Sequence, residues 1–311
     1  MSIIKLKPAC KDYLWGGDRL KKDFGKDYYG YVLAETWELS AHPDGPSVVD
    51  NGPLKGKTFP EYIEAKGKGI LGRNCERFED FPILIKFIDA HQNLSVQVHP
   101  DDAYAMKNEH QYGKTECWYI VDALPTAGIY YGLKKTLTKE EFAEKIRNNT
   151  LVDALRFQPV KKGEMYFIGA GTLHAIGAGA LIAEIQQNSN VTYRVYDFGR
   201  VAPDGKPREL HIDKAIEVSN LSGDPIRYDF GSHLADCSNF TVDDLQVDGE
   251  QFIEVGEDSF VSLLFTDGDG RVKTDEERIV FKKGDSLFIE AGTGKVSVKG
   301  KAHALMTTIR A

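Results

Sequence analysis

The sequence predicts a mainly β protein, a sandwich or barrel of antiparallel strands with a small helical portion. Short apolar runs rich in β-branched and aromatic residues recur from about residue 83, and turn-forming residues bound each of them. Most of the 30 glycines stand singly between such runs, where turns are expected. A repeated segment indicates in addition that one β unit occurs twice.

The strand-like runs follow one another closely through the middle of the chain. They alternate in part between apolar and polar residues, as half-buried strands do. In order they are ILIKFID (83–89), LSVQVH (94–99), ECWYIVDA (116–123), AGIYYG (127–132), EMYFIGAG (164–171), ALIAEIQQ (180–187) and VTYRVYDFG (191–199). The residues from about Asn239 are strand-like almost to the end.

Two segments predict helices between these strands, and a third candidate precedes them. Residues 101–110 follow a proline and carry acidic residues in the first turn. Residues 138–150 begin with Thr138 and Glu141 at the spacing of a capping box. Residues 58–70 have a weaker helical pattern. The helices interrupt the β pattern without replacing it.

The repeat pairs KKGEMYFIGAGT (161–172) with KKGDSLFIEAGT (282–293), which are identical at eight of twelve positions. Each copy reads as a polar turn, an apolar strand and a small-residue turn. The copies then diverge, because His174 in the first corresponds to Lys295 in the second. We therefore expect a site-bearing domain over residues 1–235 and a smaller domain without a metal site over residues 236–311.

Charge and cysteine usage exclude several classes of protein. The 39 Lys and Arg residues against 47 Asp and Glu give a net charge of −8, which argues against a nucleic-acid partner. No apolar run approaches the roughly 20 residues that span a bilayer, and MSIIKLKPAC lacks the apolar stretch of a signal peptide. Four scattered cysteines fit reduced thiols. We expect a cytoplasmic protein with neither a membrane nor a nucleic-acid partner.

Four residues form a candidate metal site. Strand alternation puts Gln97 and His99 on one face of their strand, and a solvated sheet face is the alternative for this segment alone. Glu116 begins the next strand, and His174 ends the first copy of the repeat. In a barrel these four side chains can converge. Two imidazoles, a carboxylate and an amide suit Zn²⁺ or another divalent transition ion in an open catalytic site.

A third polar segment, EIQQNSNVTYRVYDFGR (184–200), adds two candidates. The guanidinium of Arg194 suits a phosphate group or a developing oxyanion. Glu184 is a candidate acid or base, and for each residue alone a surface position is the alternative. A rival reading as a non-haem iron cupin oxygenase uses His99, Asp101 and His174 as the metal triad. It is weaker, because Asp101 sits where a helix cap is expected.

Ordered motifs resemble the type I mannose-6-phosphate isomerases, most closely the compact bacterial branch. They are YLWGG (13–17), AETWELSAHP (34–43), SVQVHPDD (95–102), GKTECWY (113–119), GTLHAIG (171–177) and the segment 184–200. The resemblance implies a double-cupin, jelly-roll architecture. It also implies zinc-dependent interconversion of mannose 6-phosphate and fructose 6-phosphate through a cis-enediol.

The resemblance also implies roles for individual residues. It puts one Zn²⁺ per chain on Gln97, His99, Glu116 and His174. It assigns phosphate binding and catalysis to Ser95, Lys114 and Arg194, with Glu184 as the acid or base. Trp15 is expected either in the core or against the sugar.

Two departures from the family pattern limit what can be transferred. The large helical insertion of longer members is absent, and Asn190 stands where they carry an acid. A non-catalytic double cupin that binds a sugar phosphate stays an alternative, as does a monomer or a homodimer.

Overall fold

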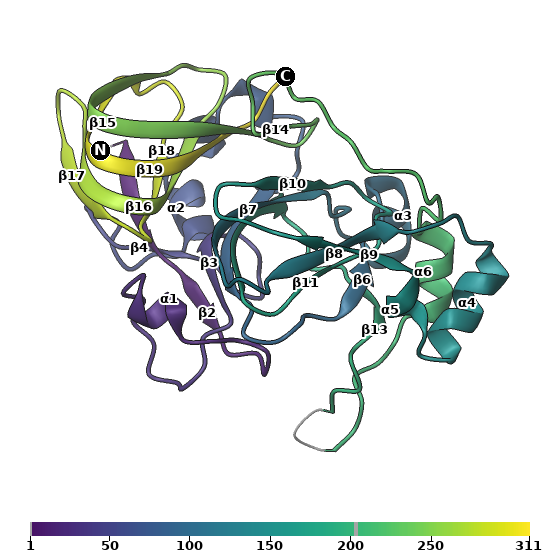
Figure 1. Ribbon diagram of the computed structural model, residues 1–311. Helices are drawn as coiled ribbons and strands as arrows, with labels where there is room; N and C mark the ends of the chain where they lie inside the picture. Colours follow the sequence, from purple (N-terminus) through teal and green to yellow (C-terminus); the bar gives the residue numbers. More distant parts are fainter. Residues whose placement is uncertain (1, 202–204) are drawn as a thin grey trace. The chain divides into compact units, whose positions relative to one another are not determined.

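The structure is a computed structural model that describes residues 2–201 and 205–311 (Figure 1). The chain divides into two compact units. The terminal unit contains Met1–Asp12, Asp18–Phe87 and Phe230–Ala311, and the middle unit contains Tyr13–Gly17 and Ile88–Asp229. This division differs from the expected domains 1–235 and 236–311, because residues 18–87 cluster with the last strands of the chain.

The middle unit contains a five-stranded sheet in the order β13-β6-β11-β8-β9. The strands are β13 (Tyr193–Tyr196), β6 (Val96–Val98), β11 (His174–Ile176), β8 (Gly128–Leu133) and β9 (Leu155–Pro159). Val96 and Val98 are fully buried in a cluster with Phe142 and Leu155, so this face of the sheet is core. The side chains that alternate with these valines point to the opposite face of the sheet.

A second set of strands in the middle unit pairs in the order β10-β7-β12. They are β10 (Met165–Ile168), β7 (Glu116–Ala123) and β12 (Ala180–Gln187). The indole of Trp118 on β7 lies 5.3 Å from the imidazole of His174 on β11, centroid to centroid. Side chains of the two sheets therefore meet, and we call the two facing surfaces the inner face of the middle unit.

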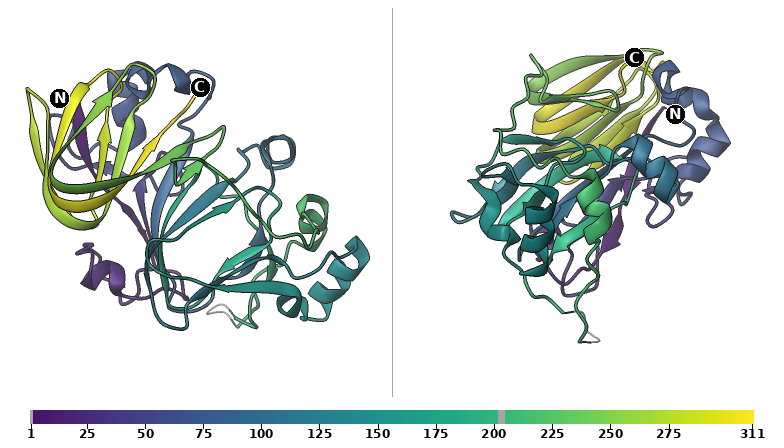
Figure 2. Two further views of the ribbon diagram at one scale, coloured as in Figure 1. Left: turned by 45° about the horizontal axis from the view of Figure 1, so that its top comes forward. Right: turned by 90° about the vertical axis from the view of Figure 1, so that its right-hand side faces the viewer.

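The helices of the middle unit are α3 (Asp102–Glu109), α4 (Lys139–Arg147), α5 (Leu151–Ala154) and α6 (Ile212–Val218). Asp101 caps α3 by accepting from the backbone N–H of Tyr104. Thr138 and Glu141 form the capping box predicted for α4. Both predicted helices are confirmed, and Figure 2 shows α4 (teal) and α6 (green) side by side.

The terminal unit contains an eight-stranded sheet in the order β14-β15-β19-β16-β18-β1-β4, with β17 paired to β16. These strands are β14 (Ala235–Asp236), β15 (Thr241–Val255), β19 (Gly294–Thr308), β16 (Val261–Lys273), β18 (Ser286–Ile289), β1 (Ile3–Lys7), β4 (Val48–Val49) and β17 (Arg278–Lys282). β1 pairs with β18 from Ile3 opposite Ile289 onward, so the two ends of the chain share one sheet (Figure 1).

The remaining elements of the terminal unit lie in its first ninety residues. They are β2 (Ala9–Lys11), α1 (Arg19–Lys22), β3 (Glu35–Leu39), α2 (Phe59–Lys66), η1 (Lys68–Leu71), η2 (Arg73–Cys75) and β5 (Ile83–Asp89), whose last two residues belong to the middle unit. The helix predicted over 58–70 is α2 followed by η1, since Gly67 has a φ of 85° and ends the α-helix.

The two copies of the repeat adopt the same local structure. In the first, the backbone N–H of Lys161 donates to the Glu164 carboxylate at 2.8 Å. In the second, that of Lys282 donates to the Asp285 carboxylate, also at 2.8 Å. A strand follows each turn, β10 in the middle unit and β18 in the terminal unit. One β unit therefore occurs in both compact units, as the sequence predicts.

Candidate metal centre and active site

Four side chains form a row across the five-stranded sheet. Gln97 on β6 lies opposite Arg194 on β13 and, on its other side, opposite His174 on β11. His174 in turn lies opposite Tyr131 on β8. Directly opposed residues in neighbouring strands point to the same face. The row therefore places a guanidinium, an amide, an imidazole and a phenol next to one another on the inner face.

The strands β7 and β12 contribute a second polar patch to the inner face. Glu116 lies opposite Gln186, and Trp118 lies opposite Glu184. The β-strand repeat of two residues puts Glu116 and Trp118 on one face and Cys117 on the other. Cys117 is fully buried, as expected of a small core side chain.

Three potential ligands meet where the two patches face each other. Ligand-type atoms of His99, Glu116 and His174 all lie within 4.8 Å of one another. Nε2 of His99 is 3.6 Å from Oε2 of Glu116, and Nε2 of His174 is 3.4 Å from Oε1 of Glu116. All three side chains are at most 1% exposed. They lie on separate strands or strand ends, so the fold alone brings them together.

Both imidazoles are held in the tautomer that suits a metal ligand. Nδ1 of His99 donates to the carbonyl of Val191, and Nδ1 of His174 donates to that of Thr172, each at 2.8 Å. Nε2 of each ring therefore carries the lone pair that can bind a metal, and the hydrogen bond from Nδ1 fixes the orientation of the ring. Burial lowers the pKa of His174 to about 3, which keeps it neutral. This donor set fits a divalent transition ion.

Gln97 and Lys114 complete the cluster. The amide nitrogen of Gln97 donates to Nε2 of His174 at 3.3 Å. Nζ of Lys114 donates to Oε2 of Glu116 at 2.5 Å and to Nε2 of His99 at 3.1 Å. A buried ammonium thus neutralises the buried carboxylate. The four predicted metal ligands and Lys114 thus form one connected cluster, in which Gln97 contacts His174 and Lys114 contacts Glu116 and His99. Their roles stay predictions.

Arg194 extends the site toward a cationic region. Its Nε donates to Oγ of Ser95 at 3.3 Å, and its Nη1 donates to the carbonyl of Glu209 at 3.0 Å. Burial lowers the pKa of Arg194, and the nearby guanidinium of Arg208 lowers it further. Arg208 itself holds the Asp197 carboxylate through two hydrogen bonds of 2.6 and 2.7 Å. Ser95 and Arg194 are thus placed together as expected of a phosphate site.

Two other predicted residues lie among side chains of the core. The carboxylate of Glu184 accepts a hydrogen bond from the indole nitrogen of Trp118 at 2.8 Å. Trp15 is 4% exposed, and its ring lies 5.6 Å from that of Tyr13. The sequence pattern did not predict that Trp118 contacts both Glu184 and His174. Strand alternation could have predicted part of this, because it puts Trp118 on the same face as Glu116.

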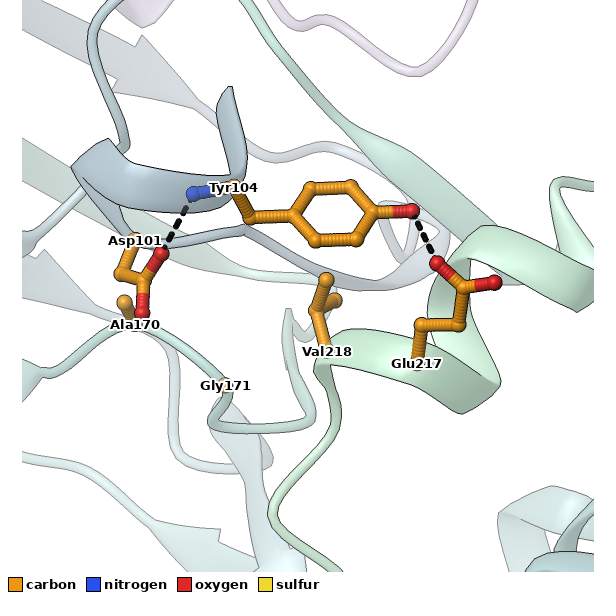
Figure 3. A pocket seen from close by; sticks show the side chains of 6 residues that line it. All are labelled: Asp101, Tyr104, Ala170, Gly171, Glu217 and Val218. Carbon is orange, nitrogen blue, oxygen red and sulfur yellow. Dashed lines mark hydrogen bonds between the residues drawn. The ribbon is translucent and has the colours of Figure 1, made fainter. Parts of the chain in front are cut away.

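A cavity of about 200 Å³ lies in the middle unit between the start of α3 and the end of α6. Figure 3 shows Tyr104 crossing it between the carboxylates of Asp101 and Glu217. The Tyr104 hydroxyl donates to Glu217 at 2.6 Å, and its backbone N–H donates to Asp101 at 2.8 Å. None of the four predicted metal ligands lines this cavity. Its lining is Asp101, Tyr104, Ala170, Gly171, Glu217 and Val218.

Comparisons with known proteins identify the family of this chain. A model of the type I phosphomannose isomerase catalytic domain matches residues 3–119, and a model of the mannose-6-phosphate isomerase cupin domain matches residues 231–309. Mannose-6-phosphate isomerase ManA of Bacillus subtilis is 38% identical over 97% of this chain and 97% of its own. The chain belongs to the mannose-6-phosphate isomerase family.

Other members of the mannose-6-phosphate isomerase family are similarly close. The enzyme of Streptococcus mutans is 39% identical over 89% of this chain and 88% of its own. A crystal structure of the mannose 6-phosphate isomerase from Bacillus subtilis superimposes with a TM-score of 0.92 at 35% identity and covers 99% of each chain. The predicted family and the mainly β cupin fold are confirmed.

Proposed function

We propose that the chain interconverts mannose 6-phosphate and fructose 6-phosphate and uses one zinc ion for the reaction. The buried cluster of His99, Glu116 and His174, in a chain of this family, carries the proposal. Aldose–ketose isomerisation moves a proton between C2 and C1 through a cis-enediol. It needs a group that carries the proton, positive charge for the enediolate oxygens and a grip on the phosphate.

The metal would be held by His99, Glu116 and His174. The side-chain oxygen of Gln97 would be the fourth ligand, once the amide turns so that this oxygen replaces the nitrogen now facing His174. Two neutral imidazoles, a carboxylate and no thiolate are typical of an open zinc site. Zinc bound there supplies Lewis acidity toward the oxygens of the sugar. The hydrogen bonds from both Nδ1 atoms to backbone carbonyls support this assignment, because they orient the ligand nitrogens before the metal arrives.

Arg194, Ser95 and Lys114 would bind the phosphate and stabilise negative charge. Arg194 and Ser95 are already hydrogen-bonded to each other, and Lys114 is 4% exposed. In such a buried setting the ammonium and guanidinium act more strongly on a developing oxyanion than they would in water. A phosphate held at this end would fix the position of C1 and C2.

Glu184 would carry the proton between C1 and C2. It is the carboxylate on the inner face that the metal site does not require, and it is 3% exposed. The hydrogen bond from Trp118 holds one carboxylate oxygen in place at 2.8 Å. A fixed carboxylate in a buried site is a suitable general base. Trp15 would line the sugar pocket.

The remaining expectations concern the setting of the enzyme. Among the residues that the structure describes, no helix is long and apolar enough to cross a membrane. We expect the enzyme to act in the cytoplasm on a free sugar phosphate, as a monomer or a homodimer. A net charge of −8 disfavours nucleic acid as a partner.

The direct test is conversion of mannose 6-phosphate by purified protein loaded with zinc, with detection of fructose 6-phosphate. We expect turnover that needs the metal and the phosphate, so that mannose itself is a poor substrate. Absence of conversion by the loaded protein would refute the proposal. Iron- and oxoacid-dependent oxygen consumption would instead support an oxygenase, and binding of the sugar phosphate without turnover would support a binding protein.

A further inference from the structure

We propose that Gln186 determines specificity at this site, with its side-chain oxygen accepting a hydrogen bond from a hydroxyl group of the bound sugar. The inference rests on the proposed function for its substrate class. Gln186 is on β12, directly opposite Glu116 on β7. Opposed residues share a face, so the Gln186 amide lies on the inner face next to a predicted metal ligand.

The orientation of this amide is fixed by its nitrogen. Nε2 of Gln186 donates to the carbonyl oxygens of Gln187 at 2.8 Å and of Ser189 at 2.7 Å. Turning the amide over would bring its own oxygen against these two carbonyl oxygens, which repel it. Oε1 is therefore the end of the amide that takes no part in these two hydrogen bonds.

Oε1 of Gln186 is buried and has no hydrogen-bond partner among the residues that the structure describes. The side chain is 0% exposed. A buried acceptor without a donor is uncommon, because it has lost its hydrogen bond to water without replacement. A ligand that brings a donor into the site accounts for such an atom.

A second acceptor follows two residues later. Oδ1 of Asn188 is also buried without a hydrogen-bond partner in the described part of the chain. The backbone N–H of Gln187 donates to the carbonyl of Thr115, so the pairing with β7 continues toward Asn188. Two unused acceptors within three residues favour a ligand rich in hydroxyl donors. A sugar provides these donors, whereas a fully ionised phosphate offers none.

The test compares mannose 6-phosphate with its 3-deoxy and 4-deoxy analogues, because the oxygens at C1 and C2 take part in the reaction. For the wild type we expect kcat/KM to fall about 5- to 50-fold for the analogue that lacks the recognised hydroxyl. Gln186→Met removes the acceptor. In this variant the kcat/KM values for the same analogue and for the parent sugar should differ by no more than about twofold.

Gln187→Met is the matched control. Both ends of the Gln187 amide are hydrogen-bonded. Its oxygen accepts from the backbone N–H of Thr115 at 2.9 Å, and its nitrogen donates to the carboxylate of Asp102 at 2.8 Å. Gln187→Met loses two side-chain hydrogen bonds, as many as Gln186→Met does. It should nevertheless keep the wild-type ratio of kcat/KM between the parent sugar and the analogue.

Three outcomes separate the inference from the proposed function. If the zinc-loaded wild type does not convert mannose 6-phosphate, the proposed function fails first. If the wild type converts it but treats both analogues like the parent sugar, the role of Gln186 is wrong, and no variant has to fold to show this. If the wild type discriminates and Gln186→Met keeps the full ratio, another residue recognises the hydroxyl.

Discussion

Lys114 and Glu116 form a buried ion pair, with Nζ of the lysine 2.5 Å from Oε2 of the glutamate. The same ammonium donates to Nε2 of His99 at 3.1 Å. It therefore touches two of the atoms that would bind the metal. In the proposed reaction, lysine at this position would bring positive charge to the place where the sugar oxygens become negative, and its charge also repels a nearby cation.

Replacing Lys114 separates these two effects. Lys114→Met should lower kcat by about 100-fold or more, because it removes one preorganised charge from the site. The zinc content should stay at the wild-type level, or the affinity for zinc should rise, since the competing ammonium is gone. Steady-state kinetics and elemental analysis of the same preparation check both expectations. Loss of zinc together with activity would mean that Lys114 supports the ligand cluster instead.

A ligand variant tests the metal site itself. His174→Ala should lose bound zinc and at least about 100-fold in activity, because the imidazole is central to the ligand cluster. His91→Ala is the control, since His91 is exposed. Titration with zinc, followed by calorimetry, should give wild-type affinity for the control. Full zinc occupancy in His174→Ala would show that the ligand assignment is wrong.

Glu184 can be tested with a nearly isosteric change. Glu184→Gln keeps an oxygen that accepts from the Trp118 indole but cannot carry a proton at this pH. We expect kcat to fall by about 100- to 10,000-fold, with a melting temperature close to that of the wild type. Activity near the wild-type level would show that Glu184 acts only by holding Trp118 in place.

His211 gives the enzyme a dependence of stability on pH. Nδ1 of His211 accepts from the backbone N–H of Arg194 at 3.2 Å, which requires a neutral ring. Burial lowers the pKa of His211 in the folded protein below its ordinary value of 6.5. The unfolded chain then binds the proton more tightly, so this contribution to stability is complete above pH 6.5 and declines as the pH falls.

The matched variant is His211→Asn, whose side-chain oxygen can accept the same hydrogen bond without titrating. When the pH is lowered from 7.5 to 5.5, the melting temperature should fall less for this variant than for the wild type. An equal fall in both proteins would show that other groups cause the acid sensitivity. Unfolding is the chosen measurement because the substrate phosphate itself titrates near pH 6.

Local patterns predicted most of what the site contains. Alternation along one strand placed Gln97 and His99 on one face, and the capping pattern at Thr138 predicted α4. The pairing of distant strands was not readable from a single sequence. Arg194 lies next to Gln97 because β13 pairs with β6, and this register depends on packing across the whole unit.

The missed features have the same physical origin. A tryptophan in an apolar run is expected in the core, and only the paired strands show that Trp118 contacts both Glu184 and His174. The unused oxygen of Gln186 depends on where a turn places two backbone carbonyls. The grouping of residues 18–87 with the last strands likewise follows from contacts across the sequence, which periodicity cannot reveal.

The pairing of β1 with β18 has a consequence for biosynthesis. A ribosome that adds about 5 to 20 residues per second makes Ile3 roughly 15 to 60 s before its partner Ile289 emerges. During that interval the first strand lacks this neighbour, and well before its end the middle unit has all of its own strands, the last of which is β13. The nascent chain should therefore complete the unit that bears the candidate metal site first, and it can close its terminal sheet only after β18 and β19 have been made.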